Sequence, residues 1–155
     1  MTKRILTLCV LGGGALLLSA CSTANIHNVQ TAEVKTDDFL YAYADCGESE
    51  EEKYLEQQII QLLRAKNIYG RDLVIKCKIL HYDEGNRFAR YMVGFGAGAA
   101  TSTIKIELEN QKNDKIGSFE VSAEMKMGVF GGSALNTIEE SAKKIVDYID
   151  KNYVK

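Results

Sequence analysis

Few side chains of this sequence have the chemistry of a catalytic or metal centre. The chain of 155 residues contains four cysteines and two histidines, and it has no proline or tryptophan. His27 and His81 leave little material for a histidine-based metal cluster or a histidine-dependent catalytic triad. Asp83 and Glu84 are adjacent, so their carboxylates diverge in a turn instead of forming an acid–base pair. We therefore expect no metal and no catalytic residues, and the cysteines carry the informative chemistry.

Cys21 closes a first segment that has the features of a secretory signal. Two basic residues near the start are followed by an apolar run over 5–18 and by small residues just before the cysteine. The run is shorter than the roughly 20 residues of a comfortable membrane span. Residues 1–20 are therefore predicted to be a cleaved signal peptide, the alternative being a retained signal anchor with a chance cysteine.

Leu18-Ser19-Ala20-Cys21 resembles the bacterial lipobox, in which the cysteine thiol receives diacylglycerol before the chain is cut and acylated. The resemblance implies that Cys21 is the lipid attachment residue of a lipoprotein. Several acyl chains hold a protein on a bilayer without a spanning helix. Similarity to Gram-negative lipoproteins also implies that Ser22, in place of Asp, permits transport to the outer membrane. The domain would then face the periplasm.

Cys46 and Cys77 are the two thiols that remain in the exported part, since Cys9 leaves with the signal. An oxidising compartment favours one disulfide between them. The alternative is a pair of free buried cysteines that act as small apolar side chains. The sequence has no Cys-x-x-Cys motif, which argues against a redox enzyme.

Composition and charge indicate one ordinary domain. The chain is 46% hydrophobic, and its 19 basic and 21 acidic residues give a net charge of -2. Such a balance provides no basic field for nucleic acid, so no nucleic-acid partner is expected.

Residues 21–36 are polar and lack a periodic apolar pattern, which predicts a lipidated tether. His27 lies in it without an evident partner. The single domain is expected over 37–155.

The first half of that domain has the pattern of a strand, a helix and a strand. Residues 39–44 alternate with a period of two, and Ser49 with Glu52 forms a capping box before a helical pattern that runs to about Lys66. A second alternation follows over 73–79. A unit of this length predicts a right-handed crossover with two parallel strands.

The second half has two clean alternations and one amphipathic helix. Residues 103–109 and 119–127 predict an antiparallel hairpin with one wet face, and residues 135–149 predict the helix. We therefore expect an α+β fold, a two-layer sandwich with a mixed four-stranded sheet in the order β-α-β then β-β-α. Both helices would cover one face. The polar face would be free to meet a partner.

A connection of about 20 residues joins the two halves, which is long for a compact domain. It contains Gly85-Asn86-Arg87, Arg90-Tyr91 and Gly94-Phe95-Gly96-Ala97-Gly98, and the segment before the last helix contains Gly128 and Phe130-Gly131-Gly132-Ser133. Together these residues resemble an uncharacterised family of small bacterial lipoproteins with a GFGAG core. The resemblance covers roughly residues 70–150 and implies no activity, because the family is a domain of unknown function.

This connection is the candidate binding loop. Arg87 and Arg90 would point the same way on a helical turn and could hold a phosphate or carboxylate, or they could pair with Asp83 or Glu84 and only fix the loop. The apolar stretch 91–100 would meet a partner protein or lipid headgroups, or would form a close-packed glycine turn. The candidate residues are Arg87, Arg90, Gly94, Phe95, Gly96 and Gly98.

No cofactor is expected. Gly94, Gly96 and Ala99 match the letters of the dinucleotide fingerprint, but a strand follows from Thr101 where that motif needs a helix.

The expected function is a membrane-anchored, non-catalytic module that binds or stabilises another envelope component. The alternatives are a small anionic-ligand binder that uses Arg87 and Arg90, and an envelope hydrolase. The hydrolase is disfavoured because no nucleophile, base and orienting group can be assembled from the sequence. Nothing in the residues indicates an oligomeric state.

Overall fold

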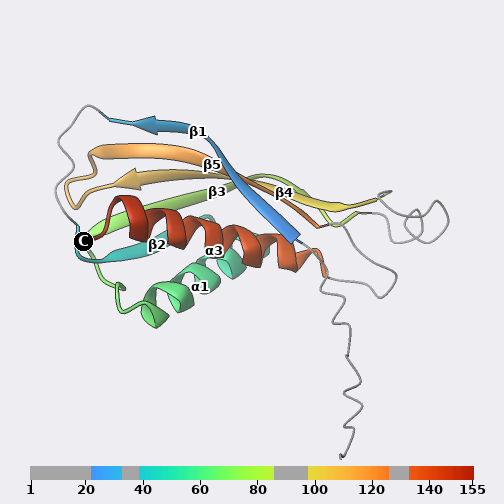
Figure 1. The fold of residues 1–155 in the computed structure, drawn as a ribbon, viewed down its shortest axis with the longest axis horizontal. Coiled ribbons are helices and arrows are strands. Elements are labelled where there is room, and N and C mark those ends of the chain that lie inside the picture. Colours follow the sequence, from blue (N-terminus) through green and yellow to red (C-terminus); the bar gives the residue numbers. More distant parts are fainter. Residues whose placement is uncertain (1–21, 33–38, 86–97, 126–132) are drawn as a thin grey trace, which may run out of the picture.

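One mixed sheet and two helices on one of its faces make up the described part of the chain (Figure 1). The computed structural model describes residues 22–32, 39–85, 98–125 and 133–155. The sheet has five strands in the order β1-β5-β4-β3-β2. The elements are β1 (Ser22–Thr31), β2 (Ala42–Cys46), α1 (Glu50–Ala65), β3 (Leu73–Asp83), β4 (Ala100–Glu109), β5 (Lys115–Met125) and α3 (Leu135–Asn152).

The crossover unit is present as predicted, with β2 parallel to β3 and α1 between them. Ser49 Oγ accepts a hydrogen bond from the Glu52 amide at 3.2 Å, and the Glu52 carboxylate accepts one from the Ser49 amide at 3.3 Å, which completes the capping box. The strand predicted over 39–44 is observed as β2, which begins at Ala42 and ends at Cys46. Phe39 forms only an isolated bridge with Val154 beyond α3.

The antiparallel hairpin of β4 and β5 also agrees with its pattern. Buried and half-buried residues alternate along the whole of β4, as a sheet with one covered face requires. Both strands begin earlier than predicted, because backbone pairing includes Ala100 opposite Met125 and Lys115 opposite Glu109. The last two residues of the predicted second strand, 126–127, lie outside the described residues. The turn between them places Asn113 at a φ of 63°, a left-handed conformation that asparagine tolerates.

The prediction of a tether over 21–36 is wrong for residues 22–31, which form β1, and the sheet therefore has five strands instead of four. β1 pairs antiparallel with β5, and Ala24 and Ile26 pack against the core. A register shift between His27 and Gln30, with Asn28 at a φ of 53°, breaks the period of two. β1 accordingly begins at Ser22, the residue after the one predicted to carry lipid.

The core lies between the helices and the sheet, and the two helices also contact each other. Leu55, Ile59 and Leu63 of α1 are fully buried, and the Phe119 and Tyr148 rings pack with centroids 4.7 Å apart. Tyr54 of α1 donates a hydrogen bond to Glu139 of α3 at 2.5 Å, and this bond to a carboxylate raises the pKa of Tyr54. The prediction of an α+β fold with both helices on one face is confirmed.

Cys46 and Cys77 form a disulfide between β2 and β3. The two residues are direct register partners at the carboxyl end of β2, and their Cα atoms are 4.5 Å apart. The cross-link closes a segment with a sequence separation of 31 residues that contains the whole of α1. It therefore ties the short edge strand β2 directly to β3.

Replacing both cysteines, Cys46→Ala with Cys77→Ala, should lower the free energy of unfolding by about 3 to 4 kcal/mol, because an unfolded loop of this length gains entropy when released. Urea denaturation of the oxidised wild type and the double variant measures the loss. The wild type treated with a thiol reductant is the control and should lose a similar amount. A loss below about 1 kcal/mol in both would contradict a stabilising cross-link.

Candidate functional site

The first strand brings Ser22, the residue after the predicted lipid site, to the sheet. Ser22 pairs with Met125 at the end of β5, and Met125 also pairs with Ala100 at the start of β4. Cys21 lies outside the described residues, but the residue that follows it is already part of the ladder. A lipid on Cys21 would thus be attached to the sheet without an intervening tether. We call this end of the sheet the anchor end.

The candidate binding loop connects two strands at the same anchor end. Asp83 at the end of β3 pairs with Thr101 near the start of β4. Gly85 and Gly98, at the two ends of the connection, have φ values of 70° and 71°, which suit glycine. The Asp83 carboxylate accepts a hydrogen bond from the Gly85 amide at 2.7 Å. Of the candidate residues, Gly98 is described, whereas Arg87, Arg90, Gly94, Phe95 and Gly96 lie outside the described residues.

A small apolar cluster closes the sheet at the anchor end. It consists of the buried residues Ala100, Met125 and Ala134, with the half-buried ring of Tyr82 packed against them. Burial raises the pKa of the Tyr82 hydroxyl, which is therefore neutral under all physiological conditions. The cluster holds the starts of β4 and α3 together next to the loop.

The sheet face opposite the helices carries a polar network, in agreement with the predicted wet face. Lys76 of β3 pairs with Asp45 of β2. Glu107 of β4 contacts the ammonium groups of Lys105 at 2.9 Å and Lys115 at 3.1 Å. Hydrogen bonds from these two lysines lower the pKa of Glu107 below its ordinary value. The charges on this face are thus largely balanced between neighbouring strands.

The lowered pKa of Glu107 predicts a small acid-dependent loss of stability. Its stabilising contribution is complete above the ordinary glutamate pKa, about 4.3, and is lost as the pH falls through the lower folded pKa. Because the side chain is 37% exposed, the contribution should not exceed about 1 kcal/mol. Glu107→Gln should flatten this part of the stability curve between pH 5 and 2 in urea titrations. Glu124→Gln, an exposed change on β5, is the control, and equal curves for both variants would contradict the assignment.

His27 is the residue whose surroundings the sequence prediction missed. Its Nε2 lies 2.7 Å from Ser122 Oγ on β5, and its Nδ1 lies 3.5 Å from a Glu120 oxygen. The side-chain amide of Asn28 donates a hydrogen bond to the same Glu120 carboxylate at 2.8 Å. A signal for β1 was present in the alternation of Ala24 and Ile26, but the bulge that follows interrupts it.

Serine, histidine and glutamate of this cluster have the residue types of a hydrolase triad, but their setting is that of a structural contact. Ser122 lies in the middle of β5, where the strand pairs with β1 on one side and β4 on the other. The backbone amides there are directed toward the neighbouring strands of the sheet. They therefore do not converge on one point as the donors of an oxyanion hole do. We therefore interpret His27 and Glu120 as cross-strand contacts that hold β1 on the sheet.

His27→Ala should weaken the docking of β1, with a loss of about 1 kcal/mol in unfolding free energy because a hydrogen bond between side chains is removed. Hydrogen–deuterium exchange of the peptide covering 22–31 should become faster than in the wild type. His81→Ala is a matched control, since His81 Nε2 lies 3.3 Å from Thr101 Oγ1 between β3 and β4. Exchange of β1 that is unchanged in His27→Ala, or equally changed in both variants, would refute this role.

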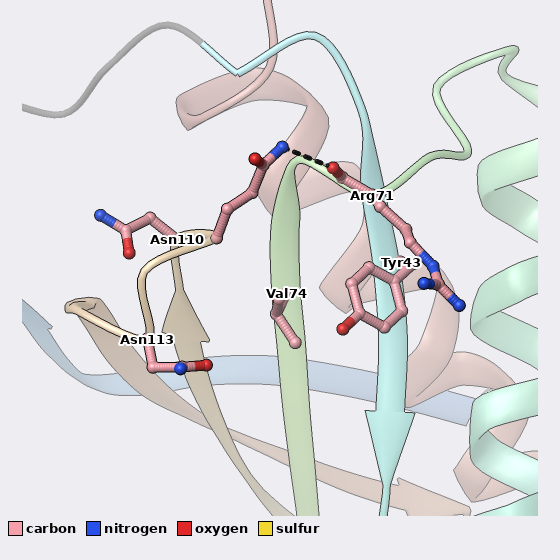
Figure 2. Close-up of a pocket in the computed structure, with 6 residues that line it drawn as sticks. Tyr43, Arg71, Val74, Asn110 and Asn113 are labelled. Carbon is pink, nitrogen blue, oxygen red and sulfur yellow. Dashed lines mark hydrogen bonds between the residues drawn. The ribbon is translucent and has the colours of Figure 1, made fainter.

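A pocket of about 300 Å³ lies at the opposite end of the sheet (Figure 2). It opens between the start of β2, the segment before β3 and the turn from β4 to β5. The side-chain amide of Gln111 donates to the Arg71 carbonyl at 2.7 Å and so links the turn to that segment. From the sequence, this turn is expected only as the connection within the predicted hairpin. The lining residues are Tyr43, Arg71, Val74, Asn110, Gln111 and Asn113.

Among the described residues, no group of three or more His, Cys, Asp or Glu side chains is arranged to hold a metal ion. Among the described helices, none combines the length and hydropathy that a membrane crossing needs.

Residues 24–129 match a family model described as a domain of unknown function, DUF4410. The match covers more than half of the sequence, and the chain therefore belongs to this family. The predicted membership of a family of unknown function is confirmed, whereas the GFGAG core that suggested it stays a prediction. Among curated proteins, no relative matches the sequence.

Solved structures share the fold at low sequence identity. A variant PelC dodecamer from Paraburkholderia phytofirmans superposes with a TM-score of 0.51 at 12% identity, over 81% of this chain and 95% of that one. A minor lipoprotein from Acinetobacter baumannii has a TM-score of 0.47 at 14% identity, over 74% of this chain and 94% of its own. The first likeness supports the described arrangement of sheet and helices.

Proposed function

We propose that this chain is a lipoprotein held at the outer membrane by lipid on Cys21, and that its domain binds another envelope component without catalysis. The observation that carries the proposal is the start of β1 at Ser22, directly after the cysteine of the lipobox-like motif. A lipid at that position would hold the anchor end of the sheet against the headgroups. No flexible spacer would separate them.

The anchor end is also where the candidate loop joins the sheet. Gly85 and Gly98 flank the connection, and the register places the adjoining ends of β3 and β4 beside the start of β1 through β5. A loop at this position would face the bilayer surface and anything embedded in it. Confinement by the lipid raises the effective concentration of the domain for such partners. This tethering is the mechanism that we propose.

Lipid attachment is tested by Cys21→Ala, with Cys9→Ala in the signal segment as a matched control. The wild type and Cys9→Ala should incorporate labelled palmitate and sediment with the outer membrane. Cys21→Ala should lose the label and leave that fraction, because the thiol that accepts diacylglycerol is gone. A wild type without label, or a Cys21→Ala form that keeps it, would overturn the proposed anchor.

Binding at the anchor end is tested with a photocrosslinking amino acid placed at Ala99, next to the candidate loop. In lipidated protein this position should give one discrete crosslinked species, identified by mass spectrometry. The species should disappear in Cys21→Ala. The same crosslinker at Lys112, in the turn at the far end, is the control and should not form it. Absence of any species from Ala99, or an equal yield from Lys112, would contradict a contact surface at the anchor end.

A further inference from the structure

The pocket at the far end of the sheet carries a positive charge that no described carboxylate neutralises. Figure 2 shows Tyr43 and Arg71 on one side of it and Asn113 on the other, with Val74 between them. From Ala100 at the anchor end, the ten residues of β4 extend about 33 Å before the turn that forms one wall. The pocket therefore lies at the opposite end of the sheet from Ser22, Gly85 and Gly98.

Arg71 provides the charge. Among the described residues its guanidinium contacts the Tyr43 ring, 6.0 Å from the ring centroid, and it has no carboxylate partner. The nearby carboxylate of Asp72 accepts a hydrogen bond from the Leu40 amide at 2.8 Å, so it is engaged elsewhere. None of the described residues that line the pocket is acidic. A planar, unneutralised guanidinium is well suited to bidentate binding of a carboxylate.

The turn from β4 to β5 adds amide groups that the fold leaves available. Asn110 is used within the turn, where its Oδ1 accepts hydrogen bonds from two backbone amides at 2.9 Å. In the described part of the chain the Asn113 side chain has no partner, and Gln111 uses only its Nε2. Figure 2 shows the Asn113 amide directed toward Val74. These groups provide both donors and acceptors, as the recognition of hydroxyl groups requires.

The floor of the pocket is apolar, although it lies on the polar face of the sheet. Val74 is only 6% exposed, whereas Lys76, two residues further along the same face of β3, extends into solvent. The Tyr43 ring forms an adjoining wall. An inorganic anion would gain nothing from such a floor, but a ring with apolar C–H groups and polar edges would fit it.

A peptide ligand is less compatible with this site. An extended peptide would pair with the backbone of β2, the edge strand beside the pocket. However, the Ala42 amide already donates to the Ile68 carbonyl at 2.8 Å, and the Ala42 carbonyl accepts from the Gly70 amide at 3.0 Å. The first residue of this edge is therefore occupied by the chain itself.

We propose that the pocket binds a carboxylated sugar residue of an anionic saccharide. Arg71 holds the carboxylate, Asn113 and Gln111 bind hydroxyl groups, and the apolar face of the sugar ring rests on Val74. The proposal goes beyond the membrane-anchored binding module and is independent of the lipid, because the site lies at the far end of the domain.

Calorimetric titration of the mature lipoprotein in detergent micelles with trigalacturonate tests this site. Arg71→Gln should weaken binding at least tenfold, because the guanidinium is the only cation among the described residues that line the pocket. Asn113→Gly keeps the left-handed backbone and should weaken binding several-fold. Arg64→Gln is the matched control, since Arg64 stacks on Tyr69 at 4.7 Å outside the pocket and should leave affinity unchanged. Thermal unfolding of each variant shows that the fold is retained.

The ligands in the titration separate the alternatives. Fully methyl-esterified trigalacturonate lacks the charge and should bind at least tenfold more weakly than the free acid. Inorganic phosphate or a dipeptide that binds as tightly as trigalacturonate would overturn the saccharide assignment. Trigalacturonate that does not bind, or that binds Arg71→Gln and the wild type equally, would also overturn it. Cys21→Ala should bind like the wild type, so failure here is distinct from failure of the anchor.

Discussion

The pairing of β1 with β5 is the contact on which the organisation of this domain depends. It adds an edge strand to the hairpin of β4 and β5 and brings the first described residue, Ser22, to the sheet opposite Met125. Without this ladder, the segment after Cys21 would be an ordinary linker, and the position of any lipid would say little about the orientation of the domain. With it, the strand direction fixes which end of the sheet a lipid on Cys21 would hold at the membrane.

The two ends of the sheet have different chemical character. At the anchor end a small apolar cluster around Met125 lies next to the ends of the candidate loop, and at the far end a guanidinium and free amides surround a shallow apolar floor. Between them runs a face of balanced ion pairs, such as Lys76 with Asp45. The proposed lipid attachment and the proposed saccharide site thus lie at opposite ends of the sheet, with a face of balanced charges between them.

Much of the fold could be predicted because local patterns and tertiary pairing agree. The capping box at Ser49 begins α1, and the clean alternation of β4 reports a sheet with one covered face. The register of β2 on β3 brings Cys46 opposite Cys77, which the cysteine count had suggested. β1 could not be recognised, because a bulge after His27 breaks its period and its partner, β5, is distant in sequence. The pocket at Arg71 could not be predicted for a related reason. Its walls come from three separate segments that only the tertiary fold brings together.

The antiparallel run of β1 along β5 also has a mechanical consequence. If the domain is held by lipid at the start of β1 and by a ligand near the turn before β5, tension between the two points acts along the strands. The two strands would then be pulled past each other, and their hydrogen bonds would share the load in shear instead of opening one after another. A sheet attached in this way is suited to resist stretching between a membrane and a polymer that lies beyond it.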